Sequence, residues 1–447
     1  MRALPVLMAL VMLVAGAAGA VASTGGAGET SAVTDPIDDA TVGGTNDDGD
    51  GDDGNGSGDG DGGSGDAVLG QLEEVDAGST FRVLSTPADA EVRSGGTVHD
   101  GNLGTSMSLA VDTADAEMET AVITRHIESA DSDADRQRRI LAAVNRVEQD
   151  EVSLHDRQMT AVDAHANGEI SDRELLNELV EVAAIAEEYD ERLDVLDDLA
   201  TETEGFSAPS RLDELQVQLQ VYEGPVRDEA LAAVRGETGG SDIHVETSQD
   251  AVVLATIDEE AGQYVREATR NDRWDRGGGE VTGDRAINVT AESYPETVAL
   301  REPSAFGAGA VHRVTVGHEF GELRTFVSGG TDQVFVEHQR IDLAEFPDFE
   351  AENAVGDGYN VTVDRSYVGG PVVVTVADAE DGDPVDDVTV TKSIGGGDSE
   401  TIGTTDADGT LRTLSPSETY RITVVDEPRV AIVDGIEPTE TPRLTDD

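Results

Sequence analysis

Hydrophobic positions recur three or four residues apart in two long stretches of the chain. Residues 139–162 place apolar side chains on one helical face, and residues 172–203 repeat this pattern with many leucines. Ser171, followed three positions later by Glu174, forms a capping box at the start of the second stretch, and Gly205 ends it. The two stretches predict a helical hairpin.

Weaker patterns flank this hairpin. Two short amphipathic segments, 212–222 and 225–235, predict further helices, and a proline opens the second of them. Residues 67–110 instead favour short extended pieces. We expect these segments and the hairpin to form one mainly helical domain over residues 67–238.

The hydrophobic period changes to two from about residue 241. Residues 243–247 and 251–257 alternate and are separated by three polar residues, which predicts a β-hairpin. Residues 259–274 predict one helix. Further strand-like runs lie at 311–316, 323–327, 333–341 and 359–363, with a glycine-rich turn at 328–332. Residues 239–368 are therefore expected to form an antiparallel α+β domain.

Short strands at regular intervals fill the last part of the chain. They lie at 372–376, 388–391, 401–404, 411–414, 420–425 and 430–433, with the turn sequences DGDP and DADG between them. This spacing is typical of a β-sandwich, which we place at residues 369–435. The chain is thus predicted to be an α+β multidomain protein, with a helical hairpin or bundle, an antiparallel α+β domain and a C-terminal β-sandwich.

The N-terminus has the pattern of a secretory signal peptide. Arg2 precedes an apolar run, and small residues end in Ala20-Val21-Ala22, so we expect a signal peptide over residues 1–22. If it is not cleaved, the same segment is just long enough to serve as a membrane anchor. No second apolar run of that length follows. Residues 23–66, rich in Gly and Asp, are expected to form a disordered acidic linker.

Charge and cysteine content narrow the functional classes. The chain has 94 acidic against 29 basic residues, a formal net charge of -65, yet 37% of its residues are hydrophobic. This balance favours a folded protein with a carboxylate-rich surface and excludes nucleic acid as a partner. The absence of cysteine excludes disulfides, thiolate catalysis and cysteine-ligated metals. Lys392 is the only lysine, and acidic proteins nearly free of lysine resemble those of salt-accumulating archaea.

Two stretches carry resemblances to known families. The run VVVTVADAEDGDPVDDVTV, followed by TIGTTDADGTLRTL, resembles the carboxypeptidase regulatory-like, or transthyretin-like, β-sandwich. The residues that carry this resemblance are Asp378, Gly382, Pro384 and Val385 in the first turn and Thr405, Asp406 and Gly409 in the second. Asp387 departs from the family, which often has a small apolar residue there. The resemblance implies a structural or binding module without catalytic residues of its own.

The rest of the chain resembles exported haloarchaeal proteins that carry domains of unknown function. The runs DAHANGEISDRELLNEL and AVVLATIDEEAGQYVREATRNDRW carry this resemblance. It implies no particular activity.

The loop from Asp163 to Glu174 has two interpretations. It matches several positions of an EF-hand calcium loop, but His165 stands where an oxygen ligand is expected. In the alternative, Asn167-Gly168 ends one helix and Ser171 with Glu174 caps the next, which makes a turn of an αα-hairpin without metal. We favour the hairpin turn, because Glu174 cannot easily both cap a helix and bind calcium.

Other candidate residues are interpreted as structural. Two strands that are expected to be neighbours carry His318, Glu319, Glu337 and His338, which could gather a metal, but these side chains are expected to face solvent. Trp274, the only tryptophan, is expected to be a packing anchor. We therefore assign no catalytic, cofactor-binding or metal-binding residues and expect no cofactor. Possible N-glycosylation sites are Asn55, Asn288 and Asn360.

These observations favour a non-enzymatic, exported or cell-surface protein of an extreme halophile. Its expected role is interaction, scaffolding or ligand binding, with an envelope component or another protein as partner. The alternative is a secreted hydrolase or metal-dependent enzyme with its site in the α+β domain. Converging histidine and carboxylate side chains in a pocket would favour the enzyme, whereas a flat polar surface would favour the interaction protein.

Overall fold

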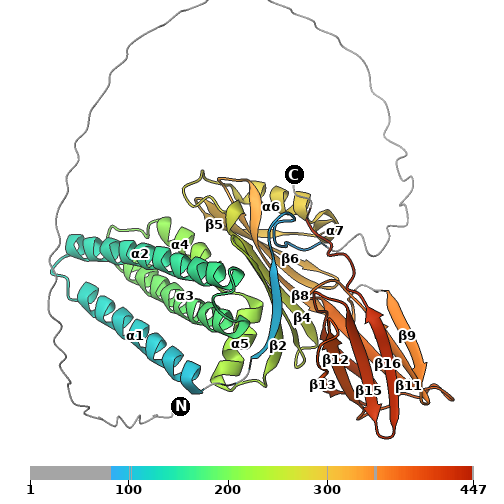
Figure 1. Ribbon diagram of the computed structural model, residues 1–447. Coiled ribbons are helices and arrows are strands. Elements are labelled where there is room, and N and C mark those ends of the chain that lie inside the picture. Colours follow the sequence, from blue (N-terminus) through green and yellow to red (C-terminus); the bar gives the residue numbers. More distant parts are fainter. Residues whose placement is uncertain (1–81, 100, 102, 300, 347–349, 445–447) are drawn as a thin grey trace, which may run out of the picture. The chain divides into compact units, whose positions relative to one another are not determined.

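The computed structural model describes residues 82–99, 101, 103–299, 301–346 and 350–444. The predicted signal peptide (1–22), the acidic linker (23–66) and Asn55 lie outside these residues. The described residues form seven α-helices and sixteen β-strands. The predicted fold class, an α+β multidomain protein with a C-terminal β-sandwich, is confirmed (Figure 1).

Five helices come first along the chain, after one strand. They are α1 (Leu103–Glu128), α2 (Asp133–Ala166), α3 (Asp172–Thr201), α4 (Arg211–Leu219) and α5 (Pro225–Arg235). The hairpin of α2 and α3 and the short helices α4 and α5 confirm the helices that were predicted from the hydrophobic periodicity. In the described part of residues 67–110, strand β1 (Arg93–His99) agrees with the expected extended pieces, whereas α1 starts at Leu103, where an extended piece was expected. Apolar residues lie on both the buried and the exposed sides of α1, which hides its helical period.

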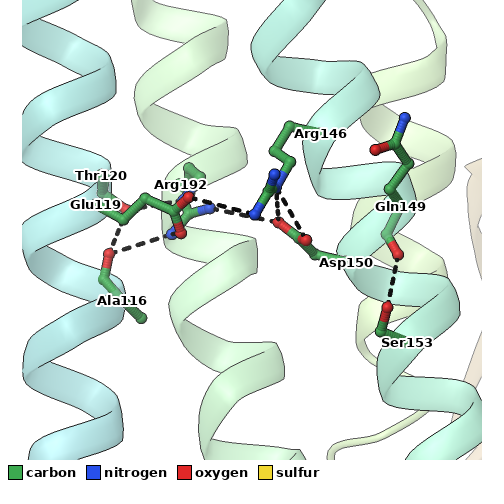
Figure 2. Close-up of polar contacts among 8 residues, drawn as sticks. All are labelled: Ala116, Glu119, Thr120, Arg146, Gln149, Asp150, Ser153 and Arg192. Carbon is green, nitrogen blue, oxygen red and sulfur yellow. Dashed lines mark hydrogen bonds and ion pairs between the residues drawn. The ribbon is translucent and has the colours of Figure 1, made fainter. Parts of the chain in front are cut away.

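A buried arginine holds α1 against the hairpin (Figure 2). The guanidinium of Arg192 in α3 is fully buried and donates to the Ala116 carbonyl (3.2 Å) and the Thr120 hydroxyl (2.9 Å) of α1. It also pairs with Glu119 of α1 at 3.1 Å and lies 3.9 Å from Asp150 of α2. One side chain thus joins three helices.

An eight-stranded antiparallel sheet forms the centre of the molecule. Its order is β1-β2-β3-β4-β8-β7-β6-β5, so β4 and β8 are central and β1 and β5 are the edges. The strands after β1 are β2 (Ser241–Ser248), β3 (Ala251–Asp258), β4 (Gln263–Arg270), β5 (Ser304–Ala308), β6 (Val311–His318), β7 (Gly321–Ser328) and β8 (Gln333–Asp342). Because β1 pairs with β2, the sheet crosses the predicted boundary at 238/239.

The predicted helix over 259–274 is wrong. This segment contains β4, which pairs with β3 on one side and with β8 on the other, followed by a 3-10 turn (Asn271–Arg273). Both faces of β4 are buried, and its Arg266 and Glu267 are held in ion pairs with Glu337 and Arg227. Charged residues inside a buried strand imitate the polar face of an amphipathic helix, which explains the error.

Each face of the sheet has its own cover. Helices α2 to α5 pack on one face through two hydrophobic clusters that include Leu215, Trp274 and Val245. Helices α6 (Gly283–Ser293) and α7 (Pro295–Val298) pack on the other face through a third cluster, centred on Ala286, Val289 and Val314.

The C-terminal part is a sandwich of two four-stranded sheets. One has the order β14-β11-β10-β9 and the other β13-β12-β15-β16. The strands are β9 (Ala351–Gly356), β10 (Tyr359–Asp364), β11 (Pro371–Asp378), β12 (Thr389–Ile394), β13 (Glu400–Thr404), β14 (Thr410–Leu414), β15 (Tyr420–Asp426) and β16 (Arg429–Ile436). Every strand predicted beyond residue 369 is present, and the side chains expected to face inward, such as Val374 and Ile422, form the core.

The sandwich begins earlier than predicted. Strands β9 and β10 precede Gly369 and pair in one sheet with β11. The boundary at 369 therefore cuts through a sheet, because the Gly369-Gly370-Pro371 sequence is a connection inside the sandwich and not a linker before it. The alternating residues of 359–363 belong to the sandwich core rather than to the α+β domain.

The sandwich is joined to the large sheet at two places. Tyr264 of β4 donates through its hydroxyl to the Gly369 carbonyl (3.1 Å), within a cluster that also buries Tyr367 and Leu414. After β16 the chain returns to the large sheet, where Val83 and Leu444 exchange backbone hydrogen bonds with the opposite segment. The first and last described residues thus lie side by side.

Candidate functional site

A cleft of about 760 Å³ opens between the edge of the large sheet and the sandwich. On the sheet side, five consecutive residues of β1, from Ser94 to Val98, line the cleft together with the start of β2 and the end of β3. On the sandwich side, the wall consists of residues of β12, β13 and β14 and of the turn at 415–418.

The cleft touches the edges of two strands that have no further strand beside them among the described residues. Successive residues of a strand point to opposite faces, so a cavity lined by five in a row lies along the edge of β1. The carbonyl of Val98 accepts a hydrogen bond from Arg173 of α3 (2.7 Å), so it points away from β2. In an antiparallel ladder, residues two positions apart direct their backbone N–H and C=O groups to the same side. The N–H and C=O groups of Gly96 therefore also point away from β2. β13, which lines the other wall, is also an edge strand.

The walls are acidic and rich in small polar residues. Seven carboxylates line the cleft: Glu229, Asp242, Asp258, Glu259, Glu260, Glu400 and Glu418. Only Lys392 and Arg412 oppose them, and no aromatic residue other than His244 takes part. Such walls favour a neutral or cationic ligand over an anionic one.

Lys392 lies between the two domains. Its Nζ donates to the Thr413 hydroxyl (3.0 Å) and approaches the Leu414 carbonyl (3.3 Å). Burial lowers the pKa of Lys392, and the nearby carboxylates of Asp242 and Glu400 act in the opposite direction. The only lysine of the chain is thus hydrogen-bonded within the sandwich, and its charge interacts with carboxylates on both walls of the cleft.

His244 fills the inner end of the cleft. Its side chain is buried, burial lowers its pKa to about 4, and its Nε2 atom has no hydrogen-bond partner within the described chain. Gly369 has a φ of 76°, and a Cβ there would lie 2.5 Å from Cδ2 of His244. The junction therefore requires glycine both for its backbone conformation and for its close approach to the ring.

A second, smaller pocket of about 120 Å³ lies where α5 meets the sheet. Arg313, Arg324 and Arg340 line it together with His338, Glu223 and Asp228. Burial, together with the charges of the surrounding arginines, lowers the pKa of His338 to about 3. Burial raises the pKa of Glu223 to about 7 and that of Asp228 to about 6. This pocket gathers a histidine and carboxylates, as expected for the alternative enzyme.

Beside this pocket, the start of α5 is hydrogen-bonded to the sheet. Glu267 of β4 accepts hydrogen bonds from the backbone N–H groups of Val226 (3.1 Å) and Arg227 (3.4 Å), at the start of α5. The Arg227 guanidinium lies 2.8 Å from Glu267 and donates to Gln158 of α2 (3.0 Å). The carboxylate therefore takes the place that an external anion would have at this helix start.

The loop from Asp163 to Glu174 has the geometry of a hairpin turn. The Ser171 hydroxyl accepts from the Glu174 backbone, and the Glu174 carboxylate accepts from the Ser171 backbone (2.9 Å) and hydroxyl (2.8 Å). Gly168 has a φ of 75°. The ring of His165 is buried between Thr247 (2.7 Å) and Asp172 (2.8 Å). Both Glu174 and His165 thus have structural partners.

The strand histidines and glutamates do not converge. β7 lies between β6, which ends at His318, and β8, which carries Glu337 and His338, so the expectation of neighbouring strands is wrong. Their expected exposure is also wrong for β8, because Glu337 is fully buried and His338 is 9% exposed. Glu337 pairs with Arg266 at 2.5 Å and accepts from Tyr294 and from the Leu84 backbone. In the described ranges, no three such side chains are placed to hold a metal ion.

Trp274 is a packing anchor, as predicted. Its ring stacks on Phe335 at 4.8 Å and meets the edge of His155 at 5.2 Å. Arg276 covers it at 4.7 Å and pairs with Glu151 of α2.

Two of the sequons lie in regular structure. Asn288 is exposed on α6, but the hydroxyl of Thr290 in the same sequon is buried against Ala286 and Thr325. Asn360 is exposed on β10, where Thr362 donates to Asn353 (2.6 Å).

The residues that line the cleft were not found from the sequence. They come from segments that lie far apart in the sequence, and none of these segments forms a motif. Two features of the sequence could have pointed to the cleft. One is the only lysine, Lys392, and the other is the glycine pairs Gly95-Gly96 and Gly239-Gly240, which are unusual in or beside strands. Among helices of the described chain, none has the length and apolarity that a membrane span requires.

Family comparisons agree with this architecture. A domain of unknown function (DUF7096) matches residues 1–239, a family of unknown function (DUF7094) matches residues 243–347, and the archaeal fibronectin-III type-like domain matches residues 350–433. The last match identifies the sandwich, while the resemblance to the transthyretin-like family stays a prediction. No curated protein and no solved structure matches the chain. Because the first match covers more than half of its length, the chain belongs to the DUF7096 family, with an archaeal fibronectin-III type-like domain at its C-terminal end.

Proposed function

We propose that this protein is a non-enzymatic, exported or cell-surface protein of an extreme halophile, and that it binds an extended polypeptide segment in the cleft. The observation that carries this proposal is the outer edge of β1, which pairs with no other strand among the described residues and lines the cleft along five consecutive residues. The Val98 carbonyl at one end of this edge is already bonded to Arg173. An extended segment can add to such an edge as a further strand, with main-chain hydrogen bonds for affinity. The export and halophilic parts rest on the N-terminal pattern and the charge.

The chemistry of the walls defines the partner further. The seven carboxylates disfavour an acidic segment, and the serines, threonines and glycines leave room for side chains without demanding large apolar ones. A neutral or basic segment of alternating β-branched residues fits these walls.

The proposal is tested by binding in multimolar salt. The probes are labelled peptides of four Thr-Val repeats, flanked by serine, arginine or aspartate. We expect the serine and arginine peptides to bind more tightly than the aspartate peptide. Gly96→Pro removes the N–H group that points into the cleft and should weaken binding about fivefold to tenfold, the value of one hydrogen bond of about 1 kcal/mol.

Gly96→Ala is the matched control, because it keeps the N–H group and its Cβ would lie 3.6 Å from the Ile243 carbonyl, an ordinary contact. It should bind like the wild type. Failure of all three peptides to bind, or equal binding by Gly96→Pro, would contradict the proposal.

The second candidate is a secreted hydrolase with its site in the pocket beside α5. It is favoured by the gathering of His338, Glu223 and Asp228 within one pocket. Mass spectrometry of the same peptides after incubation separates the two candidates. Cleavage that Glu223→Gln abolishes would favour the hydrolase, and intact peptides favour the binding protein.

A further inference from the structure

Helix α1 exposes an apolar stripe that runs from Leu103 to Val122. Leu103, Met107, Val111, Met118 and Val122 are 77, 61, 58, 60 and 59% exposed. They account for five of the fourteen large hydrophobic residues that are exposed in the described part of the chain. Three further exposed residues of the stripe are alanines: Ala110, Ala114 and Ala121. At about 100° per residue, these eight positions fall within roughly one third of the helix circumference.

The inner face of α1 is fixed, so the stripe cannot turn inward. Leu109, Ala116 and Ile127 are buried on the opposite side. Arg192 holds the same side through the Ala116 carbonyl and the Thr120 hydroxyl (Figure 2). Rolling the helix to bury the stripe would leave this buried guanidinium without its partners, which is costly.

We propose that the stripe is a contact surface for a second copy of this chain, with α1 packed antiparallel against α1 of the partner. The order of large and small residues is nearly the same in both directions from Ala114. Val111 and Met118 lie three and four positions away, and Met107 and Val122 lie seven and eight positions away. A twofold axis at Ala114 therefore brings Val111 of one copy against Met118 of the other, as an isologous contact requires.

The acidic residues beside the stripe help to decide between a membrane surface and a second copy of the chain as the partner. Asp115 and Glu117 are exposed on its two sides, and the helix has no basic residue before Arg125. A membrane-surface helix needs basic residues at this position, so an anionic lipid surface does not fit. Two copies of this chain meet with like charges at the margins, which multimolar salt screens within about 3 Å. The contact should therefore strengthen with salt.

The size of the stripe suits a weak but specific dimer. Helix α1 has 26 residues, which corresponds to a length of about 39 Å. Five large apolar side chains and three alanines from each copy bury on the order of 1,000 Å², about the minimum for a specific interface. The alanines at the centre allow close approach of the two helices.

The test is the oligomeric state of the full chain in multimolar salt. Sedimentation velocity at increasing concentration should give a dimer for the wild type. It should give a monomer with unchanged circular dichroism for the double variant Val111→Glu, Met118→Glu. The matched control is Leu141→Glu, Val152→Glu on α2, whose side chains are 42 and 46% exposed and lie outside the stripe. This control should remain dimeric.

A covalent probe tests the register separately. The chain contains no cysteine, so Ala114→Cys introduces the only thiol. In the proposed contact the two thiols meet at the twofold axis, and mild oxidation should give a disulfide-linked dimer. Val152→Cys should give no disulfide-linked dimer under the same conditions. The proposal is overturned by a wild type that is monomeric at all concentrations, as it would be if residues before 82 covered the stripe. A dimer that survives the α1 double variant also overturns it.

Discussion

The Ser171 hydroxyl and one carboxylate oxygen of Glu174 are bonded to each other and to the backbone N–H groups at the start of α3. This cap and Gly168 set the direction in which the chain leaves α2 and enters α3. The same turn places His165 against Thr247 of β2, so it also joins the hairpin to the sheet. The conformation of this loop is therefore determined by hydrogen bonds within the chain.

Ser171→Ala should lower the free energy of unfolding by about 1 kcal/mol, the usual value of a lost N-cap. Chemical denaturation in multimolar salt measures this difference. Asp163→Ala is the control, because Asp163 is exposed and outside the cap, and it should change stability by less than about 0.5 kcal/mol. Stabilisation by calcium that Asp163→Ala removes would instead support the EF-hand interpretation.

Charged residues inside the sheet could not be placed from the sequence. Glu337 and Arg266 are spaced like solvent-facing strand residues, and only the register of β4 against β8 brings them together. Trp274 was placed correctly, because a lone large aromatic residue near an element end packs inward in most folds. The residue type thus predicts burial correctly for apolar side chains. It misleads for charged side chains whose charge is neutralised by a buried partner.

At the scale of elements, α5 and the turn before it form an acidic junction with the sheet. Burial is the largest cause that raises the pKa of Glu223 to about 7. Asp190, Asp228 and Glu187 raise it further, and Arg313 opposes them. The folded state therefore holds a proton on Glu223 that the unfolded state releases at its ordinary pKa of 4.5.

This shift predicts the pH dependence of a variant. The stabilisation from protonated Glu223 is complete below pH 4.5 and is lost as the pH rises to about 7. Glu223→Gln keeps a neutral side chain, so its stability relative to the wild type should rise between these limits, by up to about 3 kcal/mol. Thermal unfolding at several pH values measures this gain. The exposed Glu237→Gln should show no such trend, and a gain for Glu223→Gln that is independent of pH would contradict the assignment.

Regular periodicity decided which elements could be predicted. The hairpin of α2 and α3 and the sandwich strands have one apolar and one polar face, and each was found. β4 and α1 were missed because neither has a single polar face. β4 is buried on both sides, and α1 is apolar on both sides. The cleft was missed because it exists only where β1 meets the sandwich across nearly 300 residues of sequence.

At the scale of the molecule, the formal charge of -65 should make folding depend on salt. Repulsion among carboxylates extends over about 10 Å at 0.1 M salt and only about 3 Å at 1 M. Helix content measured by circular dichroism should therefore fall as salt is reduced from multimolar to 0.1 M. Constant helix content over this range would argue against a halophilic protein.

The sandwich should not separate easily from the rest of the molecule during this transition. Tyr264 binds the Gly369 carbonyl, and the segment after β16 returns to the large sheet. Both connections are buried, whereas the acidic walls of the cleft are open to solvent. Loss of salt therefore acts first on the cleft, where seven carboxylates face each other.

The pairing of Val83 with the segment that ends at Leu444 has one further consequence. Because the first and last described residues are neighbours, a short linker could join them into a closed chain. The fold should then depend on the order of its elements and not on where the chain starts. A circularly permuted chain, joined at these ends and opened at the surface turn between α1 and α2, would keep every contact of the sheet and of the sandwich.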